Sequence, residues 1–226
     1  MKISLVTGCY NHADTLPLLL KSLIPQEYYL HEWLICDDGS SRATKEVLED
    51  YKKLDKVRVF EQENKGMRLA KSLNNGLREA TGDLIFIVMG DTYLEDDTLK
   101  RLDETYIRDT AGCGLRRNVN PDGSLHSWDW RFPHGRGEKI HLVGPRKFSS
   151  LTGNSMLVQK DHLEQIGYWD ERYEGYGRDD WSVFLRLDRA GIPLVAYNNI
   201  VVNHVWHGPG GADNPKNVEL FMKEFG

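Results

Sequence analysis

Carboxylates stand just beyond two short apolar runs in this sequence. Asp37 and Asp38 follow the run 33–36, and Asp91 follows the run 84–88. A carboxylate at the end of a buried strand can accept hydrogen bonds from a base or a ribose, or bind a divalent cation that neutralises a diphosphate. The same residue type also forms turns and helix caps. Taken singly, Asp37 and Asp38 fit both roles equally, and the lone Asp91 fits a turn or cap better.

Acidic, histidine and tryptophan side chains mark further places in the second half. Asp179 and Asp180 begin an apolar-periodic segment, where adjacent carboxylates either cap a helix or supply a general base. Their spacing alone favours the cap. His204 lies among β-branched residues, and is either packed in a strand or a metal ligand whose other ring nitrogen is held by a second group. Trp181 and Trp206 can stack on a sugar face or belong to the core.

Composition narrows the class of protein. The 226 residues hold 29 Lys and Arg against 34 Asp and Glu, a net charge of −5 that argues against a general nucleic-acid binder. Three cysteines, none in a CxxC pair, fit a reduced intracellular setting. No apolar stretch reaches the ~20 residues that span a bilayer, and the first apolar run is too short for a signal peptide. We therefore expect a cytoplasmic protein, held peripherally at a membrane if its acceptor is a lipid there.

The first half alternates apolar runs with amphipathic segments. This rhythm predicts a parallel sheet covered on both faces by helices. Ligands of such sheets bind beyond the carboxyl ends of the strands, where three polar clusters fall: 7–11, 37–41 and 90–92. The predicted strands are 3–6, 33–36, 57–60 and 84–88, and the predicted helices are 16–24, 44–53 and 67–80.

The second half is less periodic. We expect irregular strands and loops over 113–148, where the aromatic and basic stretch 128–136 suggests a loop near the donor or acceptor. No linker divides the chain, so we expect one domain, 1–226, with a nucleotide-binding half 1–100, an acceptor and catalytic half 101–207, and a C-terminal tail 208–226 that is turn-rich over 208–215. The other predicted elements are a strand 151–158, helices 160–166 and 180–190, and strands 194–197 and 200–205.

Six segments of the chain carry recognisable motifs. They are 4–11 (SLVTGCYN), 34–41 (LICDDGSS, like "VDDGS"), 64–74 (NKGMRLAKSLN), 82–91 (GDLIFIVMGD, like a strand ending in DxD), 167–186 (GYWDERYEGYGRDDWSVFLR) and 202–206 (VNHVW). Together, and in this order, they resemble the family-2 inverting glycosyltransferases of the GT-A fold. The last two segments also resemble galactosyl- and N-acetylgalactosaminyltransferase domains. The resemblance runs from about residue 3 to residue 207.

The resemblance implies a fold and a site. The fold is α/β, a GT-A (nucleotide-diphospho-sugar transferase) fold with a single Rossmann-like, mostly parallel sheet and a smaller acceptor-side subregion. The metal, Mn²⁺ or Mg²⁺, falls on Asp91 and His204, although Met89 replaces the first acid of DxD. Asp180 corresponds to the catalytic base, and Asp179 orients the acceptor or caps the helix. The nucleotide-sugar contacts fall on Thr7, Gly8, Cys9, Asn11, Asp38, Arg68 and Gly90, and the acceptor side on Gly153, Asn154, Trp181 and Trp206.

The implied activity is transfer of a sugar, with inversion, from a nucleotide-diphosphate sugar, most simply a UDP-sugar. The acceptor is a glycan, a lipid-linked or a small molecule, and neither nucleic acid nor a transmembrane segment is expected. Two alternatives stay open: a nucleotide-sugar-binding module without turnover, which Met89 allows, and a retaining transferase. A sugar-phosphate nucleotidyltransferase is discounted, because the loop 7–12 lacks the Gly-rich, Arg- and Lys-bearing sequence such enzymes need.

Overall fold

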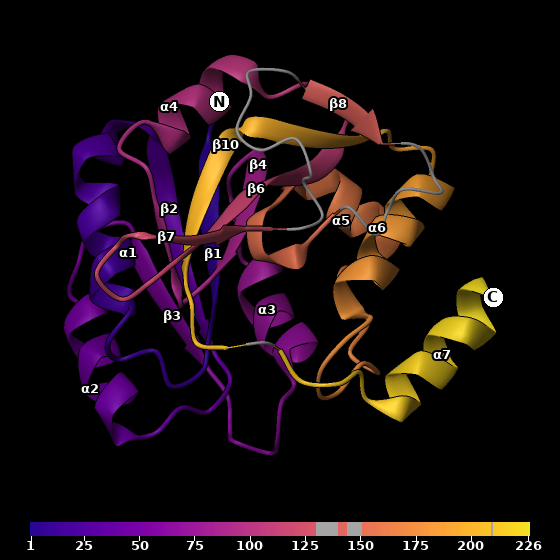
Figure 1. Cartoon of the computed structure of the whole chain (residues 1–226), viewed down its shortest axis with the longest axis horizontal. Helices are drawn as coiled ribbons and strands as arrows, with labels where there is room; N and C mark the ends of the chain where they lie inside the picture. The colour runs from indigo at the N-terminus through magenta and orange to yellow at the C-terminus, as the bar shows by residue number, and fades with distance from the viewer. Residues whose placement is uncertain (130–139, 144–150, 209) are drawn as a thin grey trace.

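The structure is a computed structural model that describes residues 1–129, 140–143, 151–208 and 210–226 (Figure 1). Most of the aromatic and basic stretch 128–136 lies outside these residues. In chain order the elements are β1 (Ile3–Cys9), α1 (Leu16–Leu23), η1 (Ile24–Tyr29), β2 (Leu30–Asp37), α2 (Arg42–Tyr51), β3 (Val57–Glu61), α3 (Leu69–Leu77), β4 (Leu84–Met89), β5 (Thr92–Leu94), α4 (Thr98–Thr105), β6 (Ala111–Val119), β7 (Leu125–Trp128), β8 (Ile140–Val143), η3 (Gly153–Ser155), β9 (Met156–Gln159), α5 (Lys160–Ile166), α6 (Asp179–Arg189), β10 (Leu194–Val205) and α7 (Pro215–Phe225).

One sheet runs through the molecule in the order β3-β2-β1-β4-β9-β6-β10-β5. Strands β3, β2, β1 and β4 are parallel, as the first half of the sequence predicts. Strand β9 is antiparallel to β4 and β6, whereas β6 and β10 are parallel to each other. Short antiparallel strands, β5, β7 and β8, border this second half. The mostly parallel arrangement therefore holds for the first half, and the second half is mixed.

Helices cover both faces of the sheet, because successive side chains of its strands point to opposite sides. Leu84, Phe86 and Val88 of β4 pack in the core under α1, α2 and α4. Ile85 and Ile87 pack in the other core, under α3, α5 and α6. Figure 1 shows α1 and α2 on one side of the sheet and α3, α5 and α6 on the other. A strand buried on both faces reads as a continuous apolar run, which is why this half could be predicted.

One second-half prediction is refined and two need correction. Strand β6 extends for nine residues into the segment predicted to hold irregular strands and loops, and its pairing with β7 has a register shift between Asn118 and Val119. Its Gly112 and Gly114 lower the intrinsic strand propensity, but a Cβ at either would collide with the backbone of β10, at Val195 and Ile200. The predicted strand 151–158 begins instead with the short helix η3. The strands predicted at 194–197 and 200–205 are one strand, β10, with a register shift between Tyr197 and Val201.

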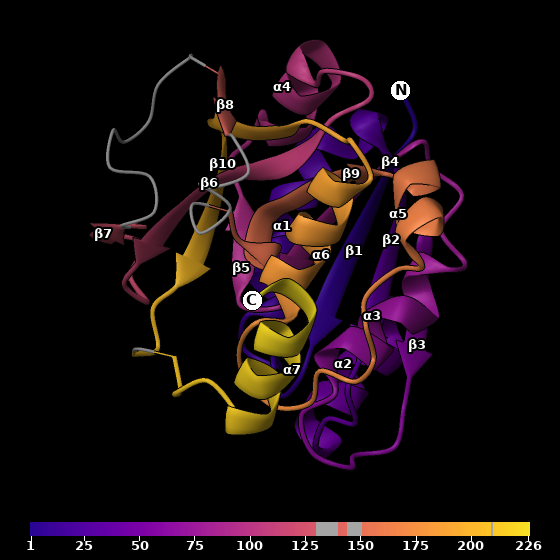
Figure 2. The same ribbon diagram turned by 90° about the vertical axis from the view of Figure 1, so that its right-hand side faces the viewer.

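The predicted tail contains a helix, α7. Asn214 caps it by accepting a hydrogen bond from the Lys216 N–H, and Pro215 occupies the first helical position. Its buried face meets α6, where Trp181 and Phe221 form an edge contact, and Figure 2 shows α7 alongside α6. Within the described residues, no helix is long and apolar enough to cross a bilayer.

Candidate metal centre and catalytic site

The three polar clusters meet at the carboxyl ends of β1, β2 and β4, as predicted. The Gly90 N–H donates to the Gly8 carbonyl at 2.9 Å, and the Asp38 N–H donates to the Cys9 carbonyl at 2.9 Å. Strand β10 delivers a second set of side chains to the same edge, because the Val205 N–H donates to the Asp91 carbonyl at 2.9 Å. Asp91 therefore lies where the two halves of the sheet come together.

Two imidazoles face one carboxylate at this edge. The Nε2 atoms of His204 and His207 lie 3.3 Å and 3.1 Å from Asp91 Oδ2. One ligand atom from each of the three residues fits within a mutual distance of 4.8 Å. Asp91 and His204 side chains are 13% and 7% exposed, whereas His207 is 61% exposed. The cluster thus has a buried base and one side open to solvent.

The orientation of His204 is fixed by its neighbours in the sheet. His204 on β10 is opposite Asn118 on β6, and its Nδ1 lies 3.0 Å from Asn118 Oδ1. The Asn118 amide donates in turn to Ser127 Oγ at 3.0 Å, which leaves Oδ1 as the acceptor for the ring. Asn118 thus holds one side of the ring, and the opposite nitrogen, Nε2, faces Asp91. Metal-binding histidines are held in this way by groups behind them.

The electrostatics of the cluster suit a cation. Burial alone would raise the pKa of Asp91, but hydrogen bonds from His204 and His207 outweigh it and hold that pKa well below its usual range. The hydrogen bond to Asp91 also raises the pKa of His207. Asp91 Oδ1 is buried without a hydrogen-bond partner among the described residues. A buried carboxylate oxygen without a donor, beside two imidazole nitrogens, fits a divalent cation.

His207 is the part of this cluster that the sequence analysis did not assign. Its signal is the spacing His204-Val-Trp-His207 at the end of an apolar strand. On a continuing strand, residues three apart face opposite sides. The strand ends at Val205, and the chain turns so that both rings reach Asp91. The sequence shows the spacing of the two histidines, but it does not predict the turn after Val205 that brings both rings to Asp91.

Asp180 is held at the start of α6 by two backbone groups. Its Oδ2 accepts from the Gly153 N–H at 3.0 Å and its Oδ1 accepts from the Trp181 N–H at 2.8 Å. A Cβ added to Gly153 would lie 2.9 Å from the Cβ of Asp180, so glycine allows this approach. The two N–H groups fix the carboxylate while leaving lone pairs on both oxygens.

The pKa of Asp179 is strongly shifted. Burial, followed by the charge of Asp180, raises the pKa of Asp179 to about 7. The residue before it, Arg178, has a left-handed backbone with φ of 72°, which is costly for a side chain other than glycine. The two carboxylates therefore share one partly buried helix start, and a residue with a strained backbone leads into it.

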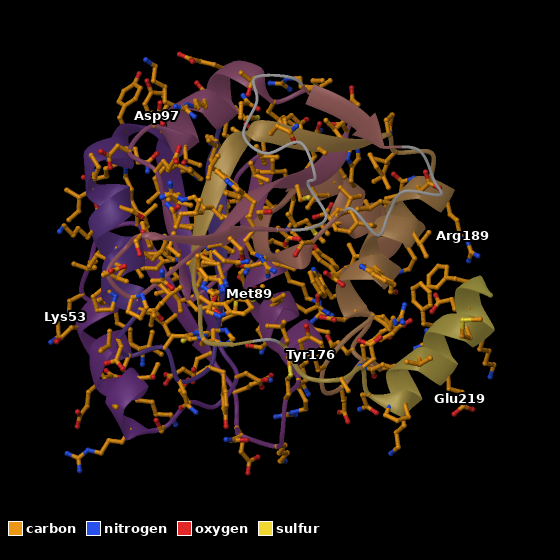
Figure 3. The ribbon with its side chains drawn as sticks, viewed as in Figure 1. Lys53, Met89, Asp97, Tyr176, Arg189 and Glu219 are labelled. Atoms are coloured by element: carbon orange, nitrogen blue, oxygen red, sulfur yellow. The ribbon has the colours of Figure 1, made fainter. Side chains whose placement is uncertain are left out.

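The acid pair and the metal cluster are joined through η3. Gly153, which holds Asp180, is followed by Asn154, whose Oδ1 accepts from the Met89 N–H at 3.1 Å. Met89 precedes Gly90 and Asp91, and Figure 3 shows it in the middle of the molecule at the end of β4. The predicted acceptor residues Gly153 and Asn154 thus connect the two acidic groups.

Asp38 lies at the predicted nucleoside position with its carboxylate already held. Gln62 Nε2 donates to Oδ1 at 2.5 Å and the Arg68 N–H donates to Oδ2 at 2.6 Å. These contacts orient the carboxylate, and each oxygen keeps a second lone pair. Asn11 has a left-handed backbone and links the loops after β1 and β2, because its Oδ1 accepts from the Ser41 N–H at 2.8 Å.

Two predicted nucleotide contacts have their side chains in the core. Thr7 is fully buried and its Oγ1 accepts from Trp33 Nε1 at 2.8 Å. Cys9 is 1% exposed, and burial raises the pKa of its thiol to about 12. Gly8 and Gly90 are close-packed positions, because a Cβ there would meet Met89 and His12 respectively. The Thr7 and Cys9 side chains, at the end of β1, are therefore turned inward, away from the predicted nucleotide.

The two predicted sugar-stacking tryptophans lie in different surroundings. Trp206 stacks on His126, with centroids 4.8 Å apart, beside the metal cluster. Trp181 lies under the Arg178 guanidinium, 4.4 Å from its ring centroid, and against Phe221 of α7. Trp206 therefore borders the metal centre, whereas Trp181 belongs to the contact between α6 and α7.

Comparison with known proteins gives relatives for most of the chain. A family model described as glycosyl transferase family 2 matches residues 4–167. The poly-beta-1,6-N-acetyl-D-glucosamine synthase of Staphylococcus epidermidis is 26% identical over 175 residues, 74% of this chain and 42% of that protein. The chondroitin synthase of Pasteurella multocida is 28% identical over 215 residues, 91% of this chain and 21% of that protein. The chain thus spans less than half the length of these relatives.

Solved structures share the fold at lower identity. TarS of S. aureus, residues 1–349 in complex with UDP, superimposes with a TM-score of 0.73 at 20% identity, covering 99% of this chain and 64% of that chain. GalNAc-T7 with UDP, GalNAc and Mn²⁺ gives a TM-score of 0.71 at 17% identity, covering 97% and 47%. The predicted GT-A fold is therefore confirmed.

Proposed function

The chain belongs to glycosyl transferase family 2, and from this premise we propose that it transfers a sugar from a UDP-sugar to an acceptor hydroxyl with inversion. One observation carries the proposal: Asp91, a partly buried carboxylate with one unpaired and buried oxygen, is linked through η3 to the acid pair Asp179 and Asp180 at one edge of the sheet. A metal-diphosphate site beside a general base is what this reaction needs.

Asp91, His204 and His207 would hold a divalent cation. The cation would offset the negative charge that develops on the departing diphosphate. One carboxylate with two imidazole nitrogens is a softer set than the all-oxygen shell that Mg²⁺ takes. We therefore favour Mn²⁺ over Mg²⁺ as the activating ion.

Asp180 would act as the general base. An acceptor hydroxyl attacks the anomeric carbon from the face opposite the diphosphate, a new C–O bond forms as the bond to the diphosphate breaks, and Asp180 takes the hydroxyl proton. The backbone N–H groups of Gly153 and Trp181 keep this carboxylate in place while it waits for the acceptor. Attack on the opposite face gives inversion.

Asp38 and Arg68 would bind the nucleoside. Both Asp38 oxygens have a lone pair left for a base N–H or a ribose hydroxyl, and Gln62 fixes their direction. Gly8 and Gly90 let the backbone approach the diphosphate closely. Trp206 and Asn154 are the described residues best placed to border the sugars.

Release of UDP from a panel of UDP-sugars, with Mn²⁺, with Mg²⁺ and with EDTA, tests the proposal. We expect Mn²⁺-dependent release that Asp180→Asn lowers by roughly 1,000-fold, while the matched control Asp188→Asn, on the same helix, changes it by less than about twofold. Full turnover by Asp180→Asn would remove the base assignment. The product's anomeric configuration, measured by NMR, distinguishes inversion from retention.

A nucleotide-sugar-binding module is the second candidate, and Met89 at the first DxD position favours it. Calorimetry separates the two functions. Donor binding without release or transfer, with every acceptor class tried, would support the module. Donor binding accompanied by turnover would support the enzyme.

A further inference from the structure

Arg178 joins the acid pair to the end of the chain. Its Nε donates to Asp213 Oδ2 at 2.7 Å. Its guanidinium lies 4.4 Å from the Trp181 ring centroid and 5.6 Å from that of Phe221. A planar cation held by a carboxylate and two rings has little freedom. Arg178 immediately precedes Asp179. Its left-handed backbone is strained, and the contacts of its side chain hold it in that conformation.

The C-terminal segment, residues 210–226, also holds the loop that leads to Arg178. The Asn214 N–H donates to the Tyr176 carbonyl at 2.8 Å, and its side-chain amide donates to the Glu174 carbonyl at 2.8 Å. The Asn217 amide donates to the Gly177 carbonyl at 2.9 Å. Figure 3 shows Tyr176 on this loop, between the strands and α7. The loop's carbonyls are thus satisfied largely by side chains distant in sequence.

We propose that Arg178 is a positioning residue for the Asp179–Asp180 pair, and that the C-terminal segment completes the catalytic site through the Arg178–Asp213 ion pair. The proposal rests on the proposed function only in taking Asp180 as the base. Asp180 is fixed at one end by the Gly153 N–H from η3. Arg178 fixes the backbone that leads into the helix carrying Asp180. The direction of the Asp180 carboxylate therefore depends on both the Gly153 N–H and Arg178.

The ion pair also sets the charge around the acids. The charged groups around Asp179 are Asp180 on its own helix, Asp213 from the C-terminal segment and the adjacent Arg178. The charges of Asp180 and Asp213 both raise the pKa of Asp179. The element η3 faces the pair with the Gly153 N–H. Removing Arg178 leaves Asp213 uncompensated, which favours the protonated acids and moves the low-pH limb of activity to higher pH. Neutralising Asp213 has the opposite sign and moves that limb to lower pH.

Arg189 is a matched control at the far end of α6 (Figure 3). Its guanidinium lies 4.5 Å from the Phe225 ring centroid, and its Nη1 donates to the Glu224 carbonyl at 3.0 Å. Arg189 therefore also joins α6 to α7 through a cation–ring contact, but far from the acids along the helix. If Arg178 only attached α7, the two arginines would be equivalent.

The test uses the full chain with Arg178→Ala, Arg178→Lys, Asp213→Asn and Arg189→Ala. We expect Arg178→Ala to lower kcat about 10- to 100-fold with the donor KM within about threefold, because the base is misplaced and the donor site is not. Arg178→Lys should recover part of kcat. Arg189→Ala should keep kcat within about twofold while lowering the melting temperature as much as Arg178→Ala.

A ¹³C NMR titration of the labelled Asp carboxyls, assigned with Asp179→Asn, measures the protonation of the acid pair independently of turnover. The pair should titrate at higher pH in Arg178→Ala and at lower pH in Asp213→Asn. Shifts of the same sign, no shift, or an equal loss of kcat in Arg189→Ala would overturn the proposal. An inactive wild type whose acids still shift oppositely would overturn the proposed transfer activity and leave the positioning role standing.

Discussion

Glu32 and Asp91 are acids at opposite ends of the parallel strands, and they differ in how their carboxylate oxygens are paired. Glu32, near the start of β2, is 7% exposed. Its Oε1 accepts from Ser4 Oγ at 2.6 Å and from the Thr81 N–H at 2.6 Å, and its Oε2 accepts from Arg58 Nη2 at 2.6 Å. Asp91, beyond the end of β4, keeps one oxygen without a donor.

Both acids are ionised, but for different reasons. Burial opposes the charge of Glu32, and the donors around it outweigh this and lower its pKa to about 2. Both oxygens of Glu32 thus have a donor from the protein, whereas Asp91 Oδ1 has none among the described residues. The pKa of Asp91 is lowered by hydrogen bonds from His204 and His207, which together with Asp91 could hold a metal ion. A buried carboxylate oxygen without a donor costs stability, and this is why we propose a bound cation beside Asp91.

Asp91→Asn should have the largest effect on function. The amide cannot supply the charge that attracts the cation, so we expect kcat/KM to fall about 1,000-fold or more, roughly 4 kcal/mol of transition-state stabilisation. UDP release at saturating Mn²⁺ measures it, with circular dichroism confirming that the variant folds. Activity within about tenfold of wild type would mean that Asp91 is no closer to function than Glu32.

Glu32→Gln should affect stability instead. We expect a loss of about 2 to 3 kcal/mol at pH 7 in urea unfolding, with turnover of the folded protein unchanged. The folded pKa is about 2 against 4.5 for the free side chain, so the contribution is complete above pH 4.5 and is lost as the pH falls toward 2. Asp50→Asn, which breaks an ion pair whose side chains are 73% and 76% exposed, is the control and should cost less than about 0.5 kcal/mol. An equal cost in both variants would contradict the comparison.

Asn118→Leu tests whether metal binding at Asp91 depends on the residue that orients the His204 ring. Without the Asn118 acceptor, His204 loses the hydrogen bond that orients its ring, and Mn²⁺ affinity should fall about 10- to 100-fold. Asn120→Ala removes an amide on the neighbouring exposed turn and should leave that affinity within about twofold of wild type. Equal Mn²⁺ affinities in the two variants would exclude a role for Asn118.

Cys9→Ala should have the smallest effect. The thiol lies on the buried side of the nucleotide loop, so we expect a cost of about 1 kcal/mol in stability and a donor KM within about twofold. Steady-state kinetics with a UDP-sugar measure the second quantity. A donor KM raised about tenfold or more would place the Cys9 side chain in the binding site after all.

The first half of the fold could be predicted because its signals are local. Strands β1 to β4 are apolar runs, and the polar residues after them, Asp38 and Asp91, mark the binding edge. The second half could not be predicted so well, because non-local packing decides it. Gly112 and Gly114 look unsuited to a strand until β10 lies against them, and α7 has its buried face only where α6 meets it.

The residues of the candidate site also fall into those that the sequence could predict and those that it could not. Asp180, Asp91 and His204 could be assigned because a resemblance to known motifs covers them. His207 and Asn118 could not, since their roles depend on the turn after β10 and on the register between β6 and β10. Thr7 and Cys9 lie within a motif, but the alternation of the strand turns their side chains into the core.

Direct Mn²⁺ binding tests the central claim, that Asp91 and its two histidines form a metal centre. Free Mn²⁺ is followed by electron paramagnetic resonance as it is titrated into wild type, Asp91→Asn and Glu32→Gln, each with and without UDP. We predict one Mn²⁺ bound by wild type and by Glu32→Gln, tighter with UDP, and affinity at least about 100-fold weaker in Asp91→Asn. Equal Mn²⁺ affinity in wild type and Asp91→Asn would contradict the account.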